Sequence, residues 1–261
     1  MICISIQPNN FTCHENLDPM LTFLRKIRHN LIKTGSARKY ALYAIGEIVL
    51  LVIGILIALQ INNWNENRKE NKISQEYLTG ITNDITKDLE QVDEILKEQI
   101  ISISLISNID NVFMEEFYEP EKHASFFNVI DTTLFKLLFS RGKSYRPRRG
   151  TYNSLISDGK SGFIKNRDIF QLLQEIYDEE NLRVASSYEA LKKIEGNIVL
   201  MYPYQKKYWT YSDLKKSKDD KIFLDLSNFV EEKYYYAANL FRLKEKMLDV
   251  LKLFEMEIRD K

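Results

Sequence analysis

Basic side chains are concentrated between residues 141 and 167 of this chain, where eight of them accompany a single acidic residue, Asp158. Guanidinium groups bind the oxygens of phosphates and carboxylates through paired N–H donors. The sequence therefore predicts an anion-binding loop at Arg146, Arg148 and Arg149, for phosphate-bearing lipid headgroups or an acidic partner surface. In the alternative interpretation, the loop is solvated and its arginines pair with acidic residues on neighbouring helices.

A second feature is an acidic residue, Glu47, inside an otherwise apolar run from Tyr40 to Ile61. On an α-helix, Gly54 and Ala58 each lie within about 20° of Glu47 around the axis. Small residues let two membrane helices approach closely, and a carboxylate in the membrane is disfavoured against lipid. We therefore expect Glu47, Gly54 and Ala58 to contact another membrane helix, from a second copy or a partner protein. The alternative is a single lipid-facing helix whose Glu47 reaches toward the cytoplasmic interface.

Residue types that carry nucleophilic or metal chemistry are scarce. The cysteines and histidines are Cys3, Cys13, His14, His29 and His123. No HExxH or ExxH spacing occurs, and the segment GKSG at 159–162 lacks the frame of a phosphate-binding loop. We expect no catalytic residue, no metal and no cofactor, and we do not expect an enzyme. The equal numbers of basic and acidic residues, 37 each, predict no nucleic-acid partner.

Tyrosines cluster in two segments, MYPYQKKYWTY at 201–211 and KYYYAANLF at 233–241. Aromatic rings beside basic residues can stack on glycans or other ligands. The simpler interpretation is that these rings pack the end of a helical bundle while their hydroxyls reach solvent.

The run from Tyr40 to Ile61 is long enough to cross a lipid bilayer, because 22 residues of α-helix span about 33 Å. Its length and the lack of a small-residue cleavage site argue against a cleaved signal peptide. The basic residues before it are Arg25, Lys26, Arg28, Lys33, Arg38 and Lys39. By the positive-inside rule, we expect a basic cytoplasmic segment at 20–39, a transmembrane helix at 40–62 and an extracytoplasmic body at 66–261.

The body is expected to be an elongated antiparallel helical bundle, because apolar residues recur with a period near 3.6 and no strand-type alternation persists. The expected elements are a helix from 66 to about 116 that stops before Pro120, a helix at 121–140, a loop at 141–150, a short helix capped by Thr151 that ends at Gly159, a long helix from Asp168 to Met201, a turn at 215–220 and a last helix from Ile222 to Arg259. The fold class is therefore all-α.

The segment FLRKIRHNLI at 23–32, followed by YALYAIGEIVLLVIGILIALQINNWNE at 40–66, resembles the N-terminal signature of a domain-of-unknown-function family of bacterial single-pass membrane proteins. The segment YNSLISDGKSGFIKN at 152–166 also resembles a recurrent part of that family. The resemblance implies a cell-envelope protein with a helical body and no assigned activity. Members of the family begin with a pattern that matches Met20, Phe23, Arg25, Lys26 and Ile27. We therefore expect residues 1–19 to be a disordered or mis-assigned N-terminal extension.

Two classes of function fit these features. The first is a structural or interaction protein of the bacterial cell envelope, which sits in the inner (cytoplasmic) membrane and acts through its bundle and its membrane helix. The second is an extracytoplasmic ligand sensor that relays a signal to a membrane partner. A cytoplasmic part of under 40 residues has no room for an output domain, which favours the first class.

Overall fold

The computed structural model describes residue 26, residue 29 and residues 37–110 and 130–259 of the chain. This described part is mostly helical and contains no strand. The chain divides into two compact units, residues 1–68 and residues 69–261. The all-α prediction, with an apolar N-terminal helix and a helical bundle, is confirmed.

The apolar segment forms the first part of α2 (Ala37–Ser107), an uninterrupted helix of 71 residues. Its most apolar window has a mean hydropathy of 2.7, and none of that window is buried. Among the residues that the structure describes, α2 alone is long and apolar enough to cross a membrane. The sequence predicted a body helix that continues to about residue 116, but α2 ends at Ser107, and residues 111–116 lie outside the described ranges.

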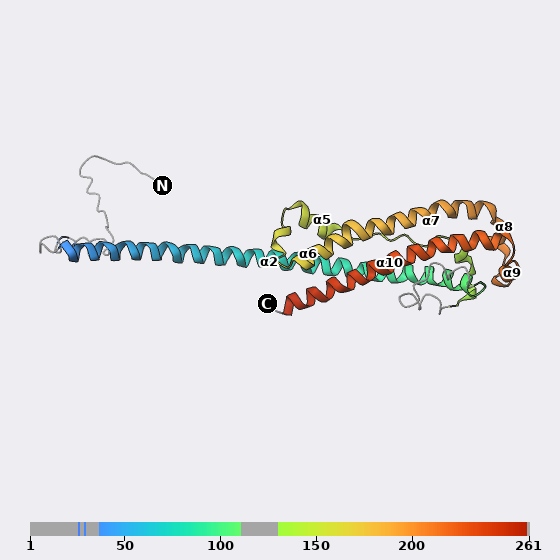
Figure 1. Ribbon diagram of the computed structural model, residues 1–261, viewed down its shortest axis with the longest axis horizontal. Coiled ribbons are helices and arrows are strands. Elements are labelled where there is room, and N and C mark those ends of the chain that lie inside the picture. The colour runs from blue at the N-terminus through green and yellow to red at the C-terminus, as the bar shows by residue number, and fades with distance from the viewer. Residues whose placement is uncertain (1–25, 27–28, 30–36, 111–129, 260–261) are drawn as a thin grey trace, which may run out of the picture. The chain divides into compact units, whose positions relative to one another are not determined.

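The second unit is built around the last part of α2, α7 (Asn181–Met201) and α10 (Lys221–Arg259) (Figure 1). Lys233 of α10 bonds Ser102 of α2, and Lys244 bonds Asp93. Residue numbers rise along α10 as they fall along α2, so these two helices are antiparallel. α10 also packs along the length of α7, from which residues 202–220 separate it in the sequence.

The core is formed by the apolar stripes that the 3.6-residue period predicts. On α2, the residues Ile81, Ile85, Val92, Leu96, Ile103 and Ile106 are buried. On α10, the buried residues include Phe223, Leu226, Val230, Tyr234, Ala237, Met247 and Phe254. These side chains belong to one hydrophobic cluster, so burial of apolar surface holds the long helices together.

The predicted loop is an extended segment, residues 140–149, that runs along α2 in the opposite direction. Arg141 lies beside Gln99, and Arg148 lies beside Asp88. Eleven helical residues rise about 16 Å, so the seven steps from Arg141 to Arg148 cover more than 2 Å each, which requires an extended chain. On its other side, Arg141 bonds Glu195 of α7. The extended segment therefore lies between α2 and α7 and completes the bundle.

Helix side chains satisfy the backbone of the extended segment in place of a strand partner. The amide of Gln91 both accepts from the backbone N–H of Arg146 (2.6 Å) and donates to its carbonyl (3.2 Å). The hydroxyl of Tyr236 accepts from the backbone N–H of Tyr145 (3.0 Å) and donates to the carbonyl of Lys143 (3.3 Å). Buried backbone groups need such partners, because an unmade hydrogen bond is costly away from water.

Two predicted helix features are wrong in detail. Residues Thr132–Phe139 form a 3₁₀ helix, η2, rather than part of an α-helix, and residues 121–129 of the predicted helix lie outside the described chain. The short helix α5 (Gly150–Ser157) begins after Arg149, so Thr151 is not its cap. The hydroxyl of Thr151 instead donates to Asp84 of α2 (2.6 Å), which ties α5 to the bundle.

The predicted helix from Asp168 to Met201 exists, but its middle is a π-helix. α6 (Arg167–Gln174) is capped by Asn166, whose side chain accepts from the backbone N–H groups of Asp168 and Ile169. The chain then widens into the π-helix η4 (Glu175–Glu180) before α7 begins. After α7, Pro203 opens α8 (Pro203–Tyr208), and a capping box of Thr210 and Asp213 opens α9 (Tyr211–Lys216). The turn was predicted at 215–220, but Lys215 and Lys216 belong to α9, and only residues 217–220 form the turn before α10.

Candidate functional site

Arg148, one of the three predicted anion-binding residues, forms an ion pair with a fully buried carboxylate. Its guanidinium lies 2.8 Å from Asp88, and its backbone N–H donates to the same side chain (2.9 Å). The hydroxyl of Tyr145 also donates to Asp88 (3.2 Å). Burial raises the pKa of Asp88, while the hydrogen bonds from Arg148 and Tyr145 act in the opposite direction. Arg148 therefore anchors the extended segment to α2.

Arg149 turns to the opposite side, toward the π-helix. Its guanidinium lies 2.9 Å from Asp178, which also accepts a hydrogen bond from the hydroxyl of Tyr152 (2.9 Å). Burial and the neighbouring carboxylate raise the pKa of Tyr152 to about 12. Arg146 is exposed, and its backbone, not its guanidinium, makes the described hydrogen bonds. The three arginines thus point to separate places, and Arg148 and Arg149 pair with acidic residues as in the alternative interpretation.

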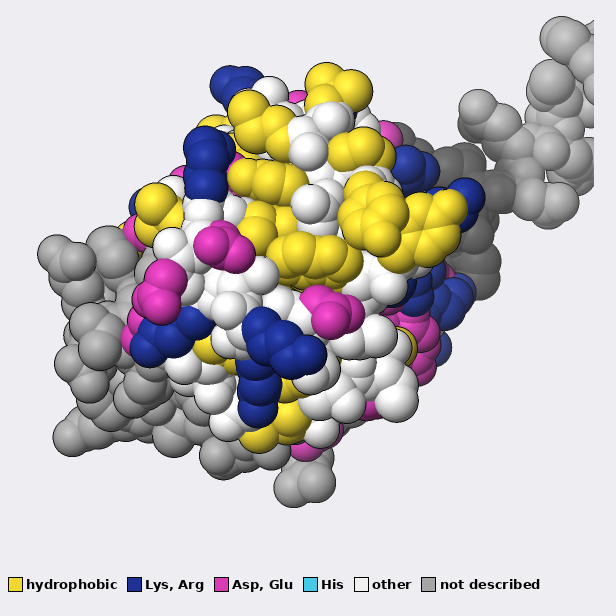
Figure 2. Space-filling model, turned by 90° about the vertical axis from the view of Figure 1, so that its right-hand side faces the viewer, with side chains coloured by type: hydrophobic (Ala, Val, Ile, Leu, Met, Phe, Trp, Pro, Cys, Tyr) yellow, Lys and Arg dark blue, Asp and Glu magenta, His cyan; other side chains and the backbone are white. Residues whose placement is uncertain are grey.

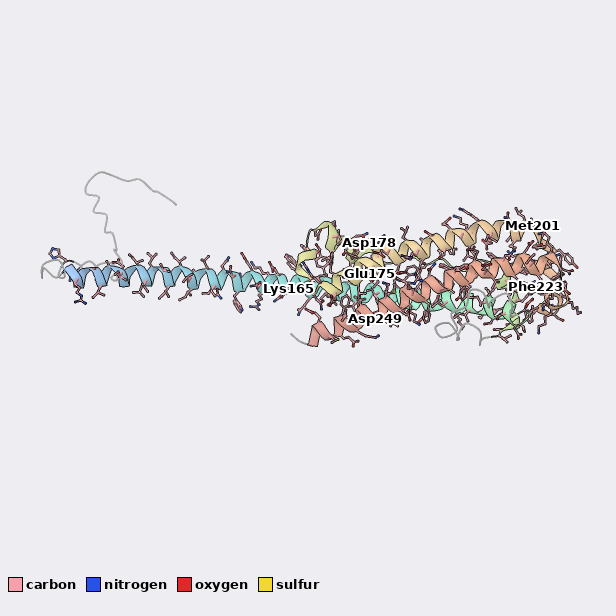
Figure 3. All side chains as sticks on the ribbon, in the orientation of Figure 1. Lys165, Glu175, Asp178, Met201, Phe223 and Asp249 are labelled. Carbon is pink, nitrogen blue, oxygen red and sulfur yellow. The ribbon has the colours of Figure 1, made fainter. Side chains whose placement is uncertain are left out.

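A pocket of about 330 Å³ lies where Arg149 meets η4 and the start of α7. Its lining residues from the extended segment are Tyr145, Pro147 and Arg149, and those from η4 and α7 are Tyr177, Asp178, Asn181, Leu182 and Ala185. Figure 3 labels Glu175 and Asp178 on the π-helix. Single π-helical turns are frequent at functional sites because they place side chains where a regular helix would not.

The end of the second unit where α7, α8 and α10 meet carries exposed apolar side chains, which we call the terminal apolar patch. It consists of Leu200, Met201, Tyr204, Tyr208 and Leu224. Figure 2 looks onto this end and shows hydrophobic side chains gathered there, and Figure 3 labels Met201 at the same end. The rings of Tyr204 and Tyr208 lie 4.9 Å apart on one face of α8. The tyrosine-rich segment 201–211 therefore contributes surface as well as core.

The membrane-helix residues Glu47, Gly54 and Ala58 all lie on α2 within the first unit. A side chain added at Gly54 would meet no described atom within 4 Å. The helix surface at Gly54 is therefore open. The contact that the sequence predicts for it stays a prediction.

A buried lysine, Lys233, lies within the core of the second unit. Its ammonium group donates to the hydroxyl of Ser102 (3.0 Å) and to the carbonyl of Leu137 (2.6 Å). Burial lowers the pKa of Lys233 to about 7, and the carboxylates of Glu195 and Glu98 partly oppose that shift. Lys233 thus connects α10 to α2 and to η2.

Sequence reasoning missed the pocket, because its polar residues Tyr177 and Asn181 resemble ordinary helix residues. One feature of the sequence does indicate this site. Asn181 falls on the apolar stripe with Leu173 and Val184, and a polar residue on a buried stripe is unusual. In the part of the chain that the structure describes, no cluster of three or more histidine, cysteine or acidic side chains could hold a metal.

The chain belongs to DUF6090, a family of unknown function, which matches residues 47–238. This match covers the apolar helix from Glu47 onward and most of the helical body. No curated protein and no solved structure matches the chain.

Proposed function

We propose that this member of a family of unknown function is a membrane-anchored interaction module, which binds a protein partner through the terminal apolar patch. The observation that carries the proposal is the exposure of this patch. Leu200, Met201 and Leu224 keep 80%, 59% and 60% of their surface accessible. Large apolar side chains gathered on a surface are typical of protein–protein contact sites.

The charges around the patch indicate what the partner surface carries. Lys206 and Lys207 lie in the last turn of α8, and the ammonium of Lys207 lies 5.2 Å from the ring centre of Tyr208. Two lysines beside exposed aromatic rings complement a surface whose apolar centre is bordered by carboxylates. We therefore expect the partner to be an envelope protein with such an acidic rim.

The proposal places α2 across the inner membrane of a bacterial cell, with the N-terminus in the cytoplasm and residues 66–261 outside. It is supported by the apolar window of α2 and by the basic residues that precede it, such as Arg38 and Lys39. A reporter that is active only outside the cytoplasm should work when fused after Lys261. Activity of a cytoplasm-only reporter at the same position would contradict this orientation.

Photo-crosslinking in native membranes tests the patch. A photoreactive residue at Leu200 or Leu224 should give one defined protein adduct, while Met256, which is 61% exposed on α10, serves as the matched control. Replacing Lys206 and Lys207 by Glu should reduce the adduct, and high salt should do the same.

Three outcomes would overturn the proposed partner. They are adducts of equal yield at Met256, adducts to lipid alone, and an adduct of twice the chain's own mass, which would assign the patch to contact between two copies.

The pocket at the π-helix favours a second function, an extracytoplasmic ligand sensor that acts through a membrane partner. This pocket combines a charged pair, Arg149 and Asp178, with apolar side chains of Pro147 and Leu182. Pockets of this composition are typical of small-molecule sites.

A further inference from the structure

The pocket between the extended segment and η4 contains buried polar atoms that have no described hydrogen-bond partner. They are the hydroxyl of Tyr177, both side-chain polar atoms of Asn181 and Nε of Arg149. Tyr177 is 1% exposed and Asn181 is 7% exposed, and both line the pocket. Each unpaired buried group costs about 1–3 kcal/mol. Four such atoms beside one pocket are therefore costly unless a ligand bonds them. Because these atoms have almost no accessible surface, a ligand can bond them only if their side chains turn toward the pocket.

The local fold explains how these atoms come together. Tyr177 and Asn181 are four residues apart, so they lie on one side of the helix where η4 passes into α7. Arg149 reaches the same place from the extended segment, and its ion pair with Asp178 (2.9 Å) fixes the guanidinium. Tyr152 holds the other carboxylate oxygen of Asp178 and stacks on Tyr177, with ring centres 4.5 Å apart. The polar groups are therefore held close together beside the pocket.

The donors and acceptors of the pocket define the ligand class. Arg149 Nε, the Asn181 amide nitrogen and the Tyr177 hydroxyl can donate, which suits the oxygens of a carboxylate. Burial raises the pKa of Tyr177, so its hydroxyl keeps its proton. The Asn181 oxygen and the Asp178 carboxylate can accept, which suits an ammonium group.

The charge balance and the walls of the pocket narrow the choice further. Arg149 and Asp178 offset each other, so the site does not select for net negative charge as a phosphate site would. Pro147, Leu182 and Ala185 supply an apolar wall. We infer that this pocket binds a free α-amino acid with an aliphatic side chain, its carboxylate toward Arg149, Tyr177 and Asn181 and its ammonium toward Asp178.

This inference deepens the second candidate function and does not depend on the terminal apolar patch. Calorimetric titration of the full chain in nanodiscs tests it with leucine, valine and alanine as probes. The matched probes are isovalerate, which is valine without its ammonium, isobutylamine, which is valine without its carboxylate, and inorganic phosphate. At least one amino acid should bind, and its matched probes should bind at least tenfold more weakly, because each loses a charge-assisted hydrogen bond.

Variants of the two unpaired side chains give a readout that does not depend on misfolding. Tyr177→Phe and Asn181→Leu remove atoms that have no described partner, so the ligand-free protein should unfold at the same temperature or higher. Both should weaken amino-acid binding at least tenfold. Tyr235→Phe and Asn197→Leu are the controls, because these exposed residues lie outside the pocket and outside the terminal apolar patch, so their changes should leave binding unaltered.

Three results would overturn the inference. The first is equal binding of phosphate or isovalerate, which would make the pocket a general anion site. The second is amino-acid binding that survives both pocket variants. The third is that no amino acid binds the unaltered chain, while both pocket variants unfold at a higher temperature than that chain. The pocket would then hold only water. Loss of the photo-crosslinks at Leu200 or Leu224 would bear on the interaction module and not on this site.

Discussion

Arg148 and Arg146 are neighbours in sequence but differ in what they contribute to stability. Asp88 is fully buried and depends on Arg148, whereas the described hydrogen bonds of Arg146 use its backbone. Arg148→Ala should lower the free energy of unfolding by about 3 kcal/mol, because it leaves a buried carboxylate without its cation. Arg146→Ala should change it by less than about 0.5 kcal/mol. Urea unfolding followed by near-ultraviolet circular dichroism compares the two. Equal effects would show that the Arg148–Asp88 pair does not anchor the extended segment.

Lys233 should make the stability of the body depend on pH. Its pKa is about 7 in the folded protein against an ordinary value of 10.5, so the unfolded chain binds more protons between these values. Stability therefore rises with pH in that window, by about 2 kcal/mol from pH 7 to pH 9, and levels off below it.

The variant Lys233→Met should lose this dependence, while the exposed Lys252→Met should keep it. Unfolding in urea at several pH values measures the slopes. A slope that persists in Lys233→Met would assign the effect to other groups.

The single residues that matter most in the second unit could be predicted only in part. The arginines at 146, 148 and 149 stood out by charge, but their partners Asp88 and Asp178 lie 60 and 29 residues away from them. No local pattern specifies which acidic residue among many a loop arginine will meet. Asn181 is a polar residue on an apolar stripe, but only the structure shows that it lines a pocket.

At the scale of elements, the extended segment depends on one glycine. Gly142 has φ +78°, and a methyl group there would lie 2.6 Å from the amide nitrogen of Gln99, which bonds the carbonyl of Arg141. Gly142→Ala should therefore destabilise the body by about 2 kcal/mol or more, from backbone strain and the clash together.

Two other glycines separate these causes. Gly159 has φ +66° and open space around it, so Gly159→Ala should show the strain alone, about 1 kcal/mol. Gly196 lies inside α7 with open space, so Gly196→Ala should stabilise by about 0.5–1 kcal/mol. Thermal unfolding should give the lowest unfolding temperature for Gly142→Ala, a higher one for Gly159→Ala and the highest for Gly196→Ala. A Gly142→Ala variant as stable as the unaltered protein would show that the extended segment does not depend on a glycine at this position.

The long helices were predictable because their cause is local. The 3.6-residue apolar period extends through α10 and the body part of α2, and each stripe is buried as expected. The sequence predicts only a loop at the extended segment, because the side chains that hold its backbone come from residues far away in the sequence. Its backbone is held by Gln91, Gln99 and Tyr236, which lie 42 to 93 residues away in sequence. The same holds for η2, whose 3₁₀ geometry follows no period in the sequence.

At the scale of the whole molecule, the chain belongs to a family of unknown function and contains a helix that is long and apolar enough to cross a membrane. The family match begins at Glu47 itself, so the shared region includes the acidic residue of the apolar run. The two units also differ in what their apolar residues do. In the second unit they fill a core, and in the first they are exposed from Ile48 to Ile61, as a membrane-spanning helix requires.

The predicted contact face of α2 can be tested by cysteine crosslinking in native membranes. With Cys3 and Cys13 replaced by serine, single cysteines at Gly54 and Ala58 lie near Glu47 around the helix, and one at Leu56 lies about 180° away. A short bifunctional thiol reagent should link the first two positions to a second copy or to a co-purified protein more efficiently than the third. Glu47→Leu should reduce those links, because the carboxylate is expected to hydrogen-bond across the contact. Equal yields at all three positions would leave the helix facing lipid on every side, with Glu47 reaching toward the interface.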